Sequence, residues 1–462
     1  ISIGILSTEL SSAQNQTMEL SLEQTVRIAR LESPDAQTAR HSFRSAYWNY
    51  KYYRANYLPT LSLTSDPNLN RAINKITMGD GSVKFVEQNL LNTDLTLNLS
   101  QNVSWTGGSL FLETSAQRMD LFSEHKYSWQ TSPVMIGYRQ SLFGYNSLKW
   151  DKRIEPVRYQ EAKKSYVETL ELVSASAINK FFALATAQSN YDIASFNYAN
   201  ADTLYHYAQG RYNIGTITEN EMLQLELNRL TEETNRMNAR IEMDNCMQEL
   251  RSYLGIQEDK EIRVRVSSRV PDFSINLNEA LALAYENSPD IQTMKRRKLE
   301  SESAVARARA NAGLKADIYL RFGLTQTADK LPEAYRNLLD QQYVSLSISL
   351  PILDWGRGKG QVRVARSNRD LVYTQVEQSR TDFELNVRKL VKQFNLQTQR
   401  VRIAARTDET ARRRNEVARK LYILGKSTIL DLNASISEKD SARRNYVSAL
   451  YNYWSLYYTL RS

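Results

Sequence analysis

The stretch LEQTVRIARLESPDAQTAR, residues Leu22–Arg40, is repeated later in the chain as LNEALALAYENSPDIQTMK, residues Leu277–Lys295. Both copies carry a Ser-Pro-Asp triplet, which begins at Ser33 and again at Ser288, about 255 residues further on. An internal duplication decides the fold, because each copy supplies the same supersecondary unit. We therefore predict two structural repeats, at residues 20–260 and 275–462.

Two further matches between the copies lie at a shorter distance. SLFGYN at Ser141–Asn146 aligns with PILDWG at Pro351–Gly356, and YNIGTIT at Tyr212–Thr218 aligns with YILGKST at Tyr422–Thr428. Both matches are about 210 residues apart. The first copy therefore holds about 45 additional residues, between its first helix and its long helix.

Composition favours long, exposed helices over a compact globule. The chain of 462 residues has a mean hydropathy of −0.52 with only 9 prolines and 16 glycines, and few helix breakers with much polarity are typical of such helices. The single cysteine, Cys246, excludes an intramolecular disulfide framework.

The net charge of +9 comes with basic clusters at Lys295–Lys298 and Arg412–Arg414. Acidic residues lie near both clusters, and no aromatic platform for base stacking accompanies them. We interpret the clusters as solvated helix faces and expect no nucleic-acid partner.

The first residues resemble the end of a secretory signal. Residues 1–13, ISIGILSTELSSA, are apolar and then small and polar, with a possible cleavage point near Ala13. No stretch of the chain approaches the ~18 apolar residues of a membrane helix. We expect a signal-peptide remnant here and a protein that leaves the cytoplasm without a helical anchor.

Helical segments of matched length recur in the two copies. Each copy has a first helix, a long helix of about 60 residues and a closing helix, between Pro and Gly breakers. The predicted segments are Ser21–Leu58, Lys149–Gln209 and Thr218–Leu254, then Asn276–Gly313, Gln361–Leu424 and Thr428–Leu460.

The first long segment carries a heptad pattern in which alanine and tyrosine each return every seven residues. Alternating spacings of three and four predict helices that supercoil around neighbours, with tyrosine knobs facing alanine holes. A row of aromatic residues that binds a cofactor is the alternative, and we favour packing. The pattern comprises Leu184, Ala187, Tyr191, Ala194, Tyr198, Ala201, Tyr205, Ala208 and Tyr212.

Between the first and the long helix of each copy the apolar period changes to two. Alternation along Asp94–Trp105 and along Val344–Leu350 predicts strands, in regions of about 59–145 and 315–355. Apolar and small polar faces are typical of a membrane barrel with a wet lumen, although a soluble sandwich gives the same alternation. An open sheet leaves unpaired edges in lipid, so several chains would have to close it. The additional residues suggest an extra hairpin at about 105–133.

The sequence contains no pattern typical of an enzyme. His41, His125 and His206 are isolated, and the glycine run Trp355–Gly360 lacks the spacing of a phosphate-binding loop. We interpret that run as a turn from a strand to a helix. We expect no catalytic residues, no metal and no cofactor.

Two turns join the long and closing helices, at Arg211–Gly215 and Leu421–Gly425, and glycine suits such a helix end. A carboxylate follows six residues after each glycine, Glu221 in the first copy and Asp431 in the second. Acids are common in the first turn of a helix because the helix dipole favours them there. A local structural role is thus the simpler interpretation of both.

Together the duplicated Ser-Pro-Asp block, the strand exit LPILDWGR at Leu350–Arg357 and the two hairpin turns resemble the TolC family of outer-membrane efflux proteins. The resemblance covers nearly the whole chain from about Leu20. It implies a mainly α fold with a membrane β-barrel portion: a duplicated helix–strands–long helix–helix unit with long coiled-coil periplasmic helices and a barrel shared by a homotrimer.

The resemblance also implies partners and a location. Such proteins lie in the outer membrane of a Gram-negative bacterium, contact its lipid, and extend a large part into the periplasm. They are passive ducts that dock with a periplasmic adaptor (membrane fusion) protein and an inner-membrane pump, and they open by an iris-like shift of the tip helices. The exported cargo, small molecules or proteins, is left open.

By the same resemblance Asp431 matches an acidic ring that narrows the closed periplasmic entrance, and Glu221 is its first-copy counterpart. Ala434 stands where a second ring acid often occurs, so the sequence departs from the family there. The 45 additional residues of the first copy are a second departure, because the family usually has two strands per copy. The residues that match the adaptor-docking region are Arg211, Tyr212, Gly215, Thr216, Tyr422, Gly425, Lys426 and Ser427.

A different class of function is the alternative. Heptad helices also occur in secreted coiled-coil scaffolds and adhesion stalks, which have no channel activity. That interpretation does not explain why rows of strands interrupt both copies at the same point. We therefore expect a passive export duct.

Overall fold

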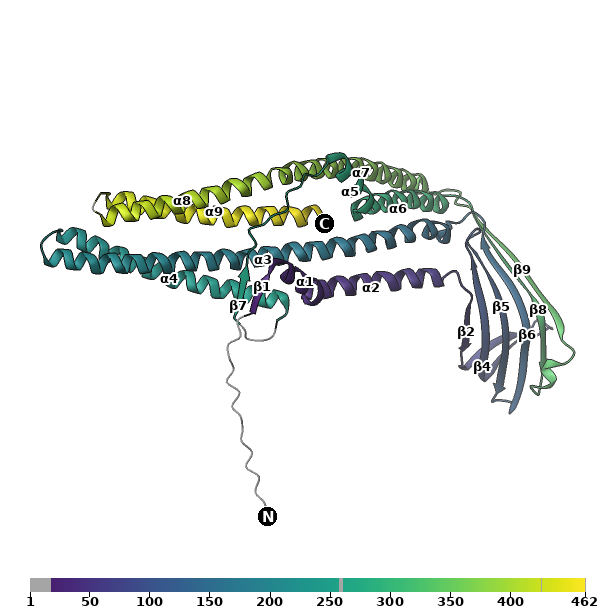
Figure 1. Cartoon of the computed structure of the whole chain (residues 1–462). Helices are drawn as coiled ribbons and strands as arrows, with labels where there is room; N and C mark the ends of the chain where they lie inside the picture. Colours follow the sequence, from purple (N-terminus) through teal and green to yellow (C-terminus); the bar gives the residue numbers. More distant parts are fainter. Residues whose placement is uncertain (1–17, 257–260, 425, 462) are drawn as a thin grey trace, which may run out of the picture. The chain divides into compact units, whose positions relative to one another are not determined.

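The computed structural model describes residues 18–256, 261–424 and 426–461, which form two compact units (Figure 1). Unit 1 holds the described residues up to Arg44, with Ala162–Pro289 and those from Arg380 onward. Unit 2 holds Ser45–Glu161 and Asp290–Ser379. The predicted signal-peptide remnant, residues 1–13, lies outside the described residues.

Helices and strands follow one another in the same order in the two repeats. The first repeat contributes α1 (Leu22–Glu32), α2 (Pro34–Ala55), β2 (Thr60–Ser65), β3 (Asn68–Thr77), β4 (Val83–Val103), β5 (Gly108–Leu121), β6 (Lys126–Ser141), α3 (Ser147–Asn213) and α4 (Glu219–Leu254). The second repeat contributes α5 (Leu277–Asn287), α6 (Pro289–Ala312), β8 (Lys315–Ala328), η1 (Glu333–Tyr335), β9 (Leu339–Ser349), α7 (Arg357–Asn395), α8 (Gln397–Ile423) and α9 (Ile429–Arg461).

The repeated Ser-Pro-Asp triplet is a helix break, so the prediction of one continuous first helix in each copy is wrong at this point. Ser33 ends α1 with an extended backbone (φ −60°, ψ 148°), and Ser288 ends α5 in the same way (φ −66°, ψ 137°). Proline disfavours the helical conformation in the residue before it and is well suited to the first position of a new helix. The Ser33 hydroxyl then accepts a hydrogen bond from the backbone N–H of Ala36 at 3.1 Å and caps α2.

The two long helices differ as well. α3 is one helix of 67 residues, whereas the predicted second long helix is divided into α7 and α8 at Leu396. Next to this break, the Asn395 side chain accepts a hydrogen bond from the Ile275 N–H at 2.9 Å and donates one to the Ile275 carbonyl at 3.0 Å. The segment that links the two repeats is thereby fastened to the break.

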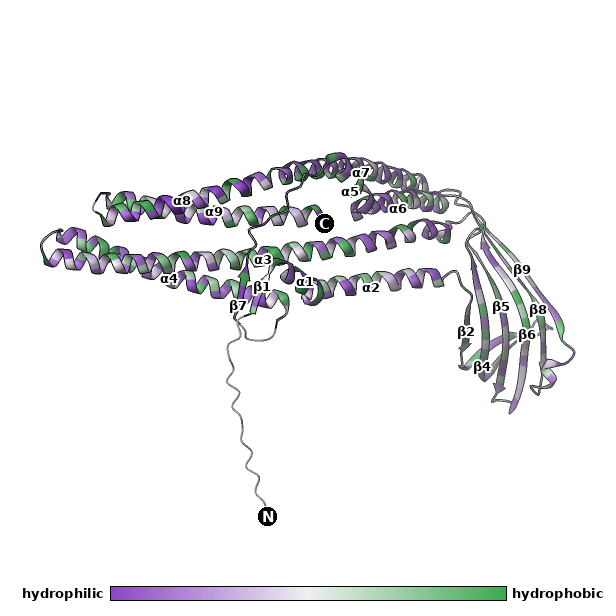
Figure 2. Cartoon of the chain, viewed as in Figure 1, coloured by the Kyte–Doolittle hydropathy of each residue, from purple (hydrophilic) through white to green (hydrophobic). Residues whose placement is uncertain are grey.

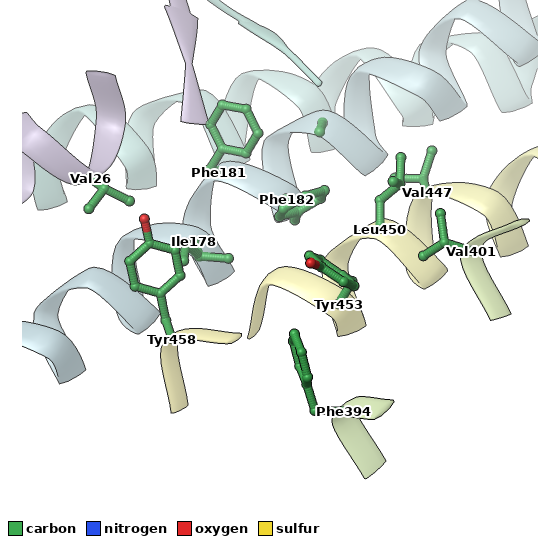
Figure 3. Packing of buried hydrophobic residues seen from close by; sticks show 11 residues of the cluster. Val26, Ile178, Phe181, Phe182, Phe394, Val401, Val447, Leu450, Tyr453 and Tyr458 are labelled. Carbon is green, nitrogen blue, oxygen red and sulfur yellow. The ribbon is translucent and has the colours of Figure 1, made fainter. Parts of the chain in front are cut away.

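The core of unit 1 combines residues from both repeats (Figure 3). Ile178, Phe181 and Phe182 of α3 pack with α9, where Tyr453 is fully buried. The Phe394 ring of α7 lies 5.3 Å from the Tyr453 ring, whose hydroxyl donates to the Pro271 carbonyl at 2.7 Å. Burial of such side chains is the main stabilising contribution, so the duplicated helices fold as one body in this unit.

A second cluster lies beside a small parallel sheet that the sequence patterns did not predict. β1 (Met18–Ser21) pairs with β7 (Ile262–Arg265), and Leu20 and Ile262 are buried against Leu250 and Leu254 of α4. Strands of four residues are too short to produce a recognisable alternation.

Unit 2 contains a seven-stranded antiparallel sheet with the order β2-β4-β5-β6-β8-β9 (Figure 1). β2 and β3 pair one after the other along the same edge of β4, so together they occupy one position and the sheet is six strands wide. β6 leads into α3 as β9 leads into α7, so β6 of the first repeat corresponds to β9 of the second. β2 and β3 follow α2 as β8 follows α6, so β2 and β3 together correspond to β8. The surplus strands of the first repeat are therefore β4 and β5, residues 83–121. This range differs from the predicted hairpin at 105–133, which included the first half of β6.

One face of the sheet is apolar and exposed. The pairs Leu61–Leu99, Leu99–Leu112, Leu112–Ile136 and Ile136–Phe322 form a row across five strands. All five side chains are 37–63% exposed, and apolar and polar residues alternate along the strands (Figure 2). Water-facing sheets do not normally carry such a row, whereas lipid-facing sheets do.

The other face of the sheet is polar and locked by specific contacts. Glu113 of β5 forms a 3.0 Å ion pair with Arg321 of β8, on either side of β6. The Phe111 ring lies over Gly137, where a Cβ would be 2.0 Å from the ring, and it stacks on Tyr319 at 5.9 Å. Only glycine fits at position 137. Among the described helices, none is at once long and apolar enough to cross a membrane.

Phe394→Ala tests the shared core. Removing this fully buried ring should lower the free energy of unfolding by about 3–5 kcal/mol, because a cavity remains between α7 and α9. The control Ile403→Ala, at a side chain 58% exposed, should cost about 0.5 kcal/mol or less. Chemical denaturation of unit 1 helicity, followed by circular dichroism, measures both; equal losses would mean that the two repeats do not share this core.

Candidate functional site at the hairpin tips

The tip of the first helical hairpin is a Schellman turn between α3 and α4. The Thr216 N–H donates to the Arg211 carbonyl, and the Gly215 N–H donates to the Tyr212 carbonyl, both at 2.9 Å. Gly215 has a φ of 74°, which a residue with a side chain adopts only with strain. This turn reverses the chain within a few residues, as the sequence predicts for a helix end.

The tip of the second hairpin has one backbone hydrogen bond in common with the first. The Lys426 N–H donates to the Leu421 carbonyl at 2.9 Å, the bond that corresponds to Thr216–Arg211 in the first copy. Gly425, which was predicted as a docking residue, lies outside the described residues. Ser427 is half-buried and Lys426 is exposed.

Both candidate gate acids occupy the same position, the third residue of a helix with a threonine cap. The Glu221 carboxylate accepts from the Thr218 N–H at 3.1 Å, and the Glu221 N–H donates to the Thr218 hydroxyl at 3.3 Å. The Asp431 N–H likewise donates to the Thr428 hydroxyl at 3.1 Å. Such a capping box satisfies backbone donors that a helix start leaves free. The local role expected for acids in a first turn is thus present in both copies.

Asp431 differs from Glu221 in the number of donors around it. Its Oδ2 accepts from the Thr428 hydroxyl at 2.8 Å and from the Thr428 N–H and the Ser427 hydroxyl at 3.4 Å each. The Thr428 hydroxyl, more than any other group, lowers the pKa of Asp431 below its ordinary value of 3.8. Asp431 is exposed and carries its negative charge at neutral pH.

Two of the predicted docking residues, Tyr422 and Arg211, influence each other electrostatically. Partial burial raises the pKa of Tyr422, the Arg211 charge lowers it, and the Glu221 charge raises it. The end of α8 therefore lies within electrostatic range of the tip between α3 and α4. Thr216 is exposed and Tyr212 is 38% exposed.

The tips also expose apolar side chains that the sequence analysis did not single out. Ile214 and Leu430 are each 75% exposed and Leu424 is 67% exposed. Ile214 and Leu424 occupy matching positions, one residue before the glycine of each turn. In the sequence, the placement of a large apolar residue directly before the glycine of both turns was the signal that could have predicted these exposed apolar side chains.

The heptad pattern of α3 forms an intrahairpin seam that includes arginines of α4. Ala187, Ala194, Ala201 and Ala208 are 3–8% exposed, as expected for the holes of a coiled coil. The tyrosines between them lie under arginine side chains, a cation–π arrangement. The pairs and their distances from guanidinium carbon to ring centroid are Arg229–Tyr205 at 5.5 Å, Arg236–Tyr198 at 4.1 Å and Arg240–Tyr191 at 5.7 Å.

The second hairpin has a polar seam at the corresponding positions. Asp408 and Asn415 stand where the first copy has Tyr198 and Tyr205, and both are buried. Asp408 forms ion pairs with Arg412 at 2.8 Å and with Arg443 of α9 at 3.4 Å, and the Asn415 amide donates to Ser435 of α9 at 3.0 Å. Buried ion pairs stabilise less than apolar packing of equal volume, so the two hairpins are held by different interactions.

The basic clusters are paired with carboxylates. Lys298 lies 2.9 Å from Glu377, Arg296 lies between Glu161 and Glu300, and Arg414 contacts Glu438. These are helix-surface ion pairs, in agreement with the interpretation of the clusters as helix faces.

The glycine run before α7 is the predicted turn from a strand to a helix. The Asp354 carboxylate accepts from the backbone N–H of Gly356 at 2.9 Å and of Gly358 at 2.8 Å, and Gly356 has a φ of 82°. Among the described residues there is no group of three or more His, Cys, Asp and Glu side chains placed to hold a metal ion.

Comparison with known proteins agrees with this architecture. Residues 280–462 match the family model described as outer membrane efflux protein. This is a family of export channels and not of enzymes. Toxin and drug export protein A of Aggregatibacter actinomycetemcomitans is 23% identical over 451 residues, which is 91% of this chain and 94% of that protein.

Solved outer-membrane channels share the fold. The CmeC channel of Campylobacter jejuni has a TM-score of 0.69 at 15% identity, with 95% of this chain and 84% of that chain covered. VceC of Vibrio cholerae has a TM-score of 0.65 at 14% identity, with 95% and 94% covered. The likeness extends over both repeats, including residues before the family match.

A double-mutant cycle at Tyr198 and Arg236 tests the arginine seam. Tyr198→Leu and Arg236→Gln should each destabilise the first hairpin, and the double variant should show a coupling of about 0.5–1 kcal/mol from the lost cation–π contact. Thermal unfolding in detergent measures the cycle. Arg236→Gln combined with Tyr207→Leu, a ring that lies under Arg211 instead, serves as the control and should be additive. Additive effects in both cycles would mean that the Arg236–Tyr198 contact does not stabilise the first hairpin.

Proposed function

We propose that this chain forms the trimeric outer-membrane duct of a tripartite export system. Its residues 280–462 match the outer membrane efflux proteins, and its fold is that of outer-membrane channels throughout. It would be passive, with the energy supplied by an inner-membrane pump and the connection made by a periplasmic adaptor. The cargo class, small molecules or proteins, follows from the pump.

One observation carries the proposal: a sheet with one exposed apolar face and one polar face, inserted at the same point of two helical repeats. The Leu99–Leu112–Ile136 row suits lipid, and the Glu113–Arg321 pair on the opposite face suits water. A duct needs such a sheet in the membrane and long helices on one side of it. Neither a catalytic group nor a cofactor enters this function.

The adaptor docks, in this proposal, at the hairpin tips and the groove beside them. Ile214, Leu424 and Leu430 offer apolar contacts at the tips. A groove of about 520 Å³ between α3, α4 and α9 is lined by several asparagines. Within the described chain the buried Oδ1 atoms of Asn190 and Asn197 accept no hydrogen bond. The asparagine lining suits a helical partner with polar side chains.

The alternative, a secreted coiled-coil scaffold or adhesion stalk, gives no account of the exposed apolar row on the sheet. The family match and the related channels do not support it either.

Asp431 and Glu221 are the proposed gate residues at the periplasmic entrance. Three copies would bring three Asp431 carboxylates into a ring, and their charge would favour cations. Ala434 adds no second acid, so a single ring would carry the preference.

Asp431→Asn tests the gate. The asparagine retains a capping oxygen for Thr428 but removes the charge, so we expect a weaker cation preference in single-channel recordings. From Asp431→Ala we expect a higher closed-state conductance. Glu23→Gln, a first-turn acid of α1, is the matched control. Unchanged conductance and selectivity in both Asp431 variants would exclude Asp431 from the gate.

The same recordings have a defined pH dependence. The hydrogen bonds from Thr428 lower the pKa of Asp431 in one chain, whereas repulsion between three carboxylates in a ring raises it. Cation preference should be present at pH 7 and disappear in acid, once the ring carboxylates are protonated. A cation preference that is unchanged between pH 7 and about pH 2 would assign it to a group other than a carboxylate.

Purification from membranes tests the duct as a whole. We expect extraction only with detergent, a trimer by native mass spectrometry, and co-purification of one adaptor and one pump from cross-linked membranes. A freely soluble monomer that captures neither protein would contradict the proposal.

A further inference from the structure

We infer that copies of this chain close a barrel of eighteen strands, six from each of three copies, by pairing β2 of one copy with β9 of the next. The inference rests on the proposed trimer and concerns what the surplus strands do. In the family pattern of two strands per repeat, three copies would give twelve strands.

The sheet of one chain ends in two open edges. Within the described residues β2 pairs only with β4, and β9 pairs only with β8. A sheet edge in lipid leaves backbone N–H and C=O groups without partners, at a cost of several kcal/mol per group. Six strands are also too few for one chain to close on itself, since about eight form the smallest filled barrel.

The two edges are complementary in direction. All neighbouring strands are antiparallel, so six strands in alternation leave β2 and β9 running in opposite directions. A second identical chain can then add to the edge with the same antiparallel pattern. An odd number of strands would force a parallel junction at every seam.

The two edges are also complementary in their faces. On the polar face of the sheet β2 presents Ser62 and Thr64, and β9 presents Ser345, Ser347 and Ser349. On the apolar face the edges carry exposed side chains, which are Leu61 (63%), Leu63 (63%), Val344 (66%), Leu346 (58%) and Ile348 (63%). Pairing of β2 with β9 continues both faces across the seam, so the partner that fits is a second copy of this chain.

The surplus strands are integral to this sheet and do not form a separate cap. β4 is paired with β5 from Leu90 to Val103, and β5 is paired with β6 along nearly its whole length. The Glu113–Arg321 ion pair then ties β5 to β8 of the second repeat. Removal of the β4–β5 hairpin from the barrel wall would break the β2–β4 and β5–β6 pairings and the Glu113–Arg321 ion pair.

The surplus strands widen the pore. With strands ~4.8 Å apart and tilted by ~40°, twelve strands give a backbone diameter of about 24 Å and eighteen give about 36 Å. Natural barrels of 16–18 strands enclose an aqueous channel. The membrane portion therefore exerts little size selection on small molecules and leaves room for a polypeptide.

Counting strands by electron cryomicroscopy of the detergent-solubilised full chain tests the inference. We expect a trimer with eighteen strands in one wall. A trimer with twelve strands would overturn the inference and leave the proposed function intact. A particle that is not a trimer would overturn the proposed function as well.

Cysteine cross-linking across the seam tests the pairing in membranes. In a Cys246→Ser background, Ser62→Cys combined in turn with Ser345→Cys, Ser347→Cys or Ser349→Cys should give at least one pair that oxidises to a trimer on a non-reducing gel. Ser115→Cys in the inner strand β5, combined with Ser347→Cys, is the matched control and should remain monomeric. Monomers from all three seam pairs would contradict the β2–β9 junction.

Discussion

Every backbone donor and acceptor of a sheet in lipid has to be paired within the protein, and the rest of this structure depends on that constraint. The chain holds a sheet that is open at β2 and at β9, with an apolar face that is exposed from Leu61 to Phe322. Such a sheet is incomplete alone. Closure by identical copies would satisfy the edges, and six strands from each copy would make every junction antiparallel. The duplication fits the same constraint, because each repeat contributes an even number of strand positions between two helical segments.

The helices of unit 1 use one plan with two chemistries. The turns of both hairpins share a backbone hydrogen bond, and the helix after each turn begins with a threonine cap, at Thr218 and at Thr428. Along the seam, however, the first copy places arginines over tyrosines, whereas the second buries Asp408 among arginines. The two copies thus keep the same geometry and differ in the chemistry that holds each pair together.

Local patterns in the sequence predicted much of this. The repeat, the alternating strands, the glycine turn at Gly215 and a first-turn role for the acids all depend on neighbours within a few residues. The misses depend on distant contacts. The break at Leu396 coincides with a hydrogen-bonded link between Asn395 and Ile275, 120 residues apart. Ser33 was read as part of one helix, although the proline after it gives the physical reason for a break. The limits of the surplus strands became clear only from pairing, since β6 alternates in the same way as β5.

The central claim is that the two faces of the sheet contact lipid and water. Single cysteines along β4, labelled with an environment-sensitive fluorophore in reconstituted membranes, measure this directly. The account predicts that labels at Leu95, Leu97 and Leu99 are quenched by lipid-borne nitroxides, and that labels at Thr96 and Asn98 are quenched by aqueous iodide. Equal quenching of both sets by iodide would describe a sheet in water and contradict the account.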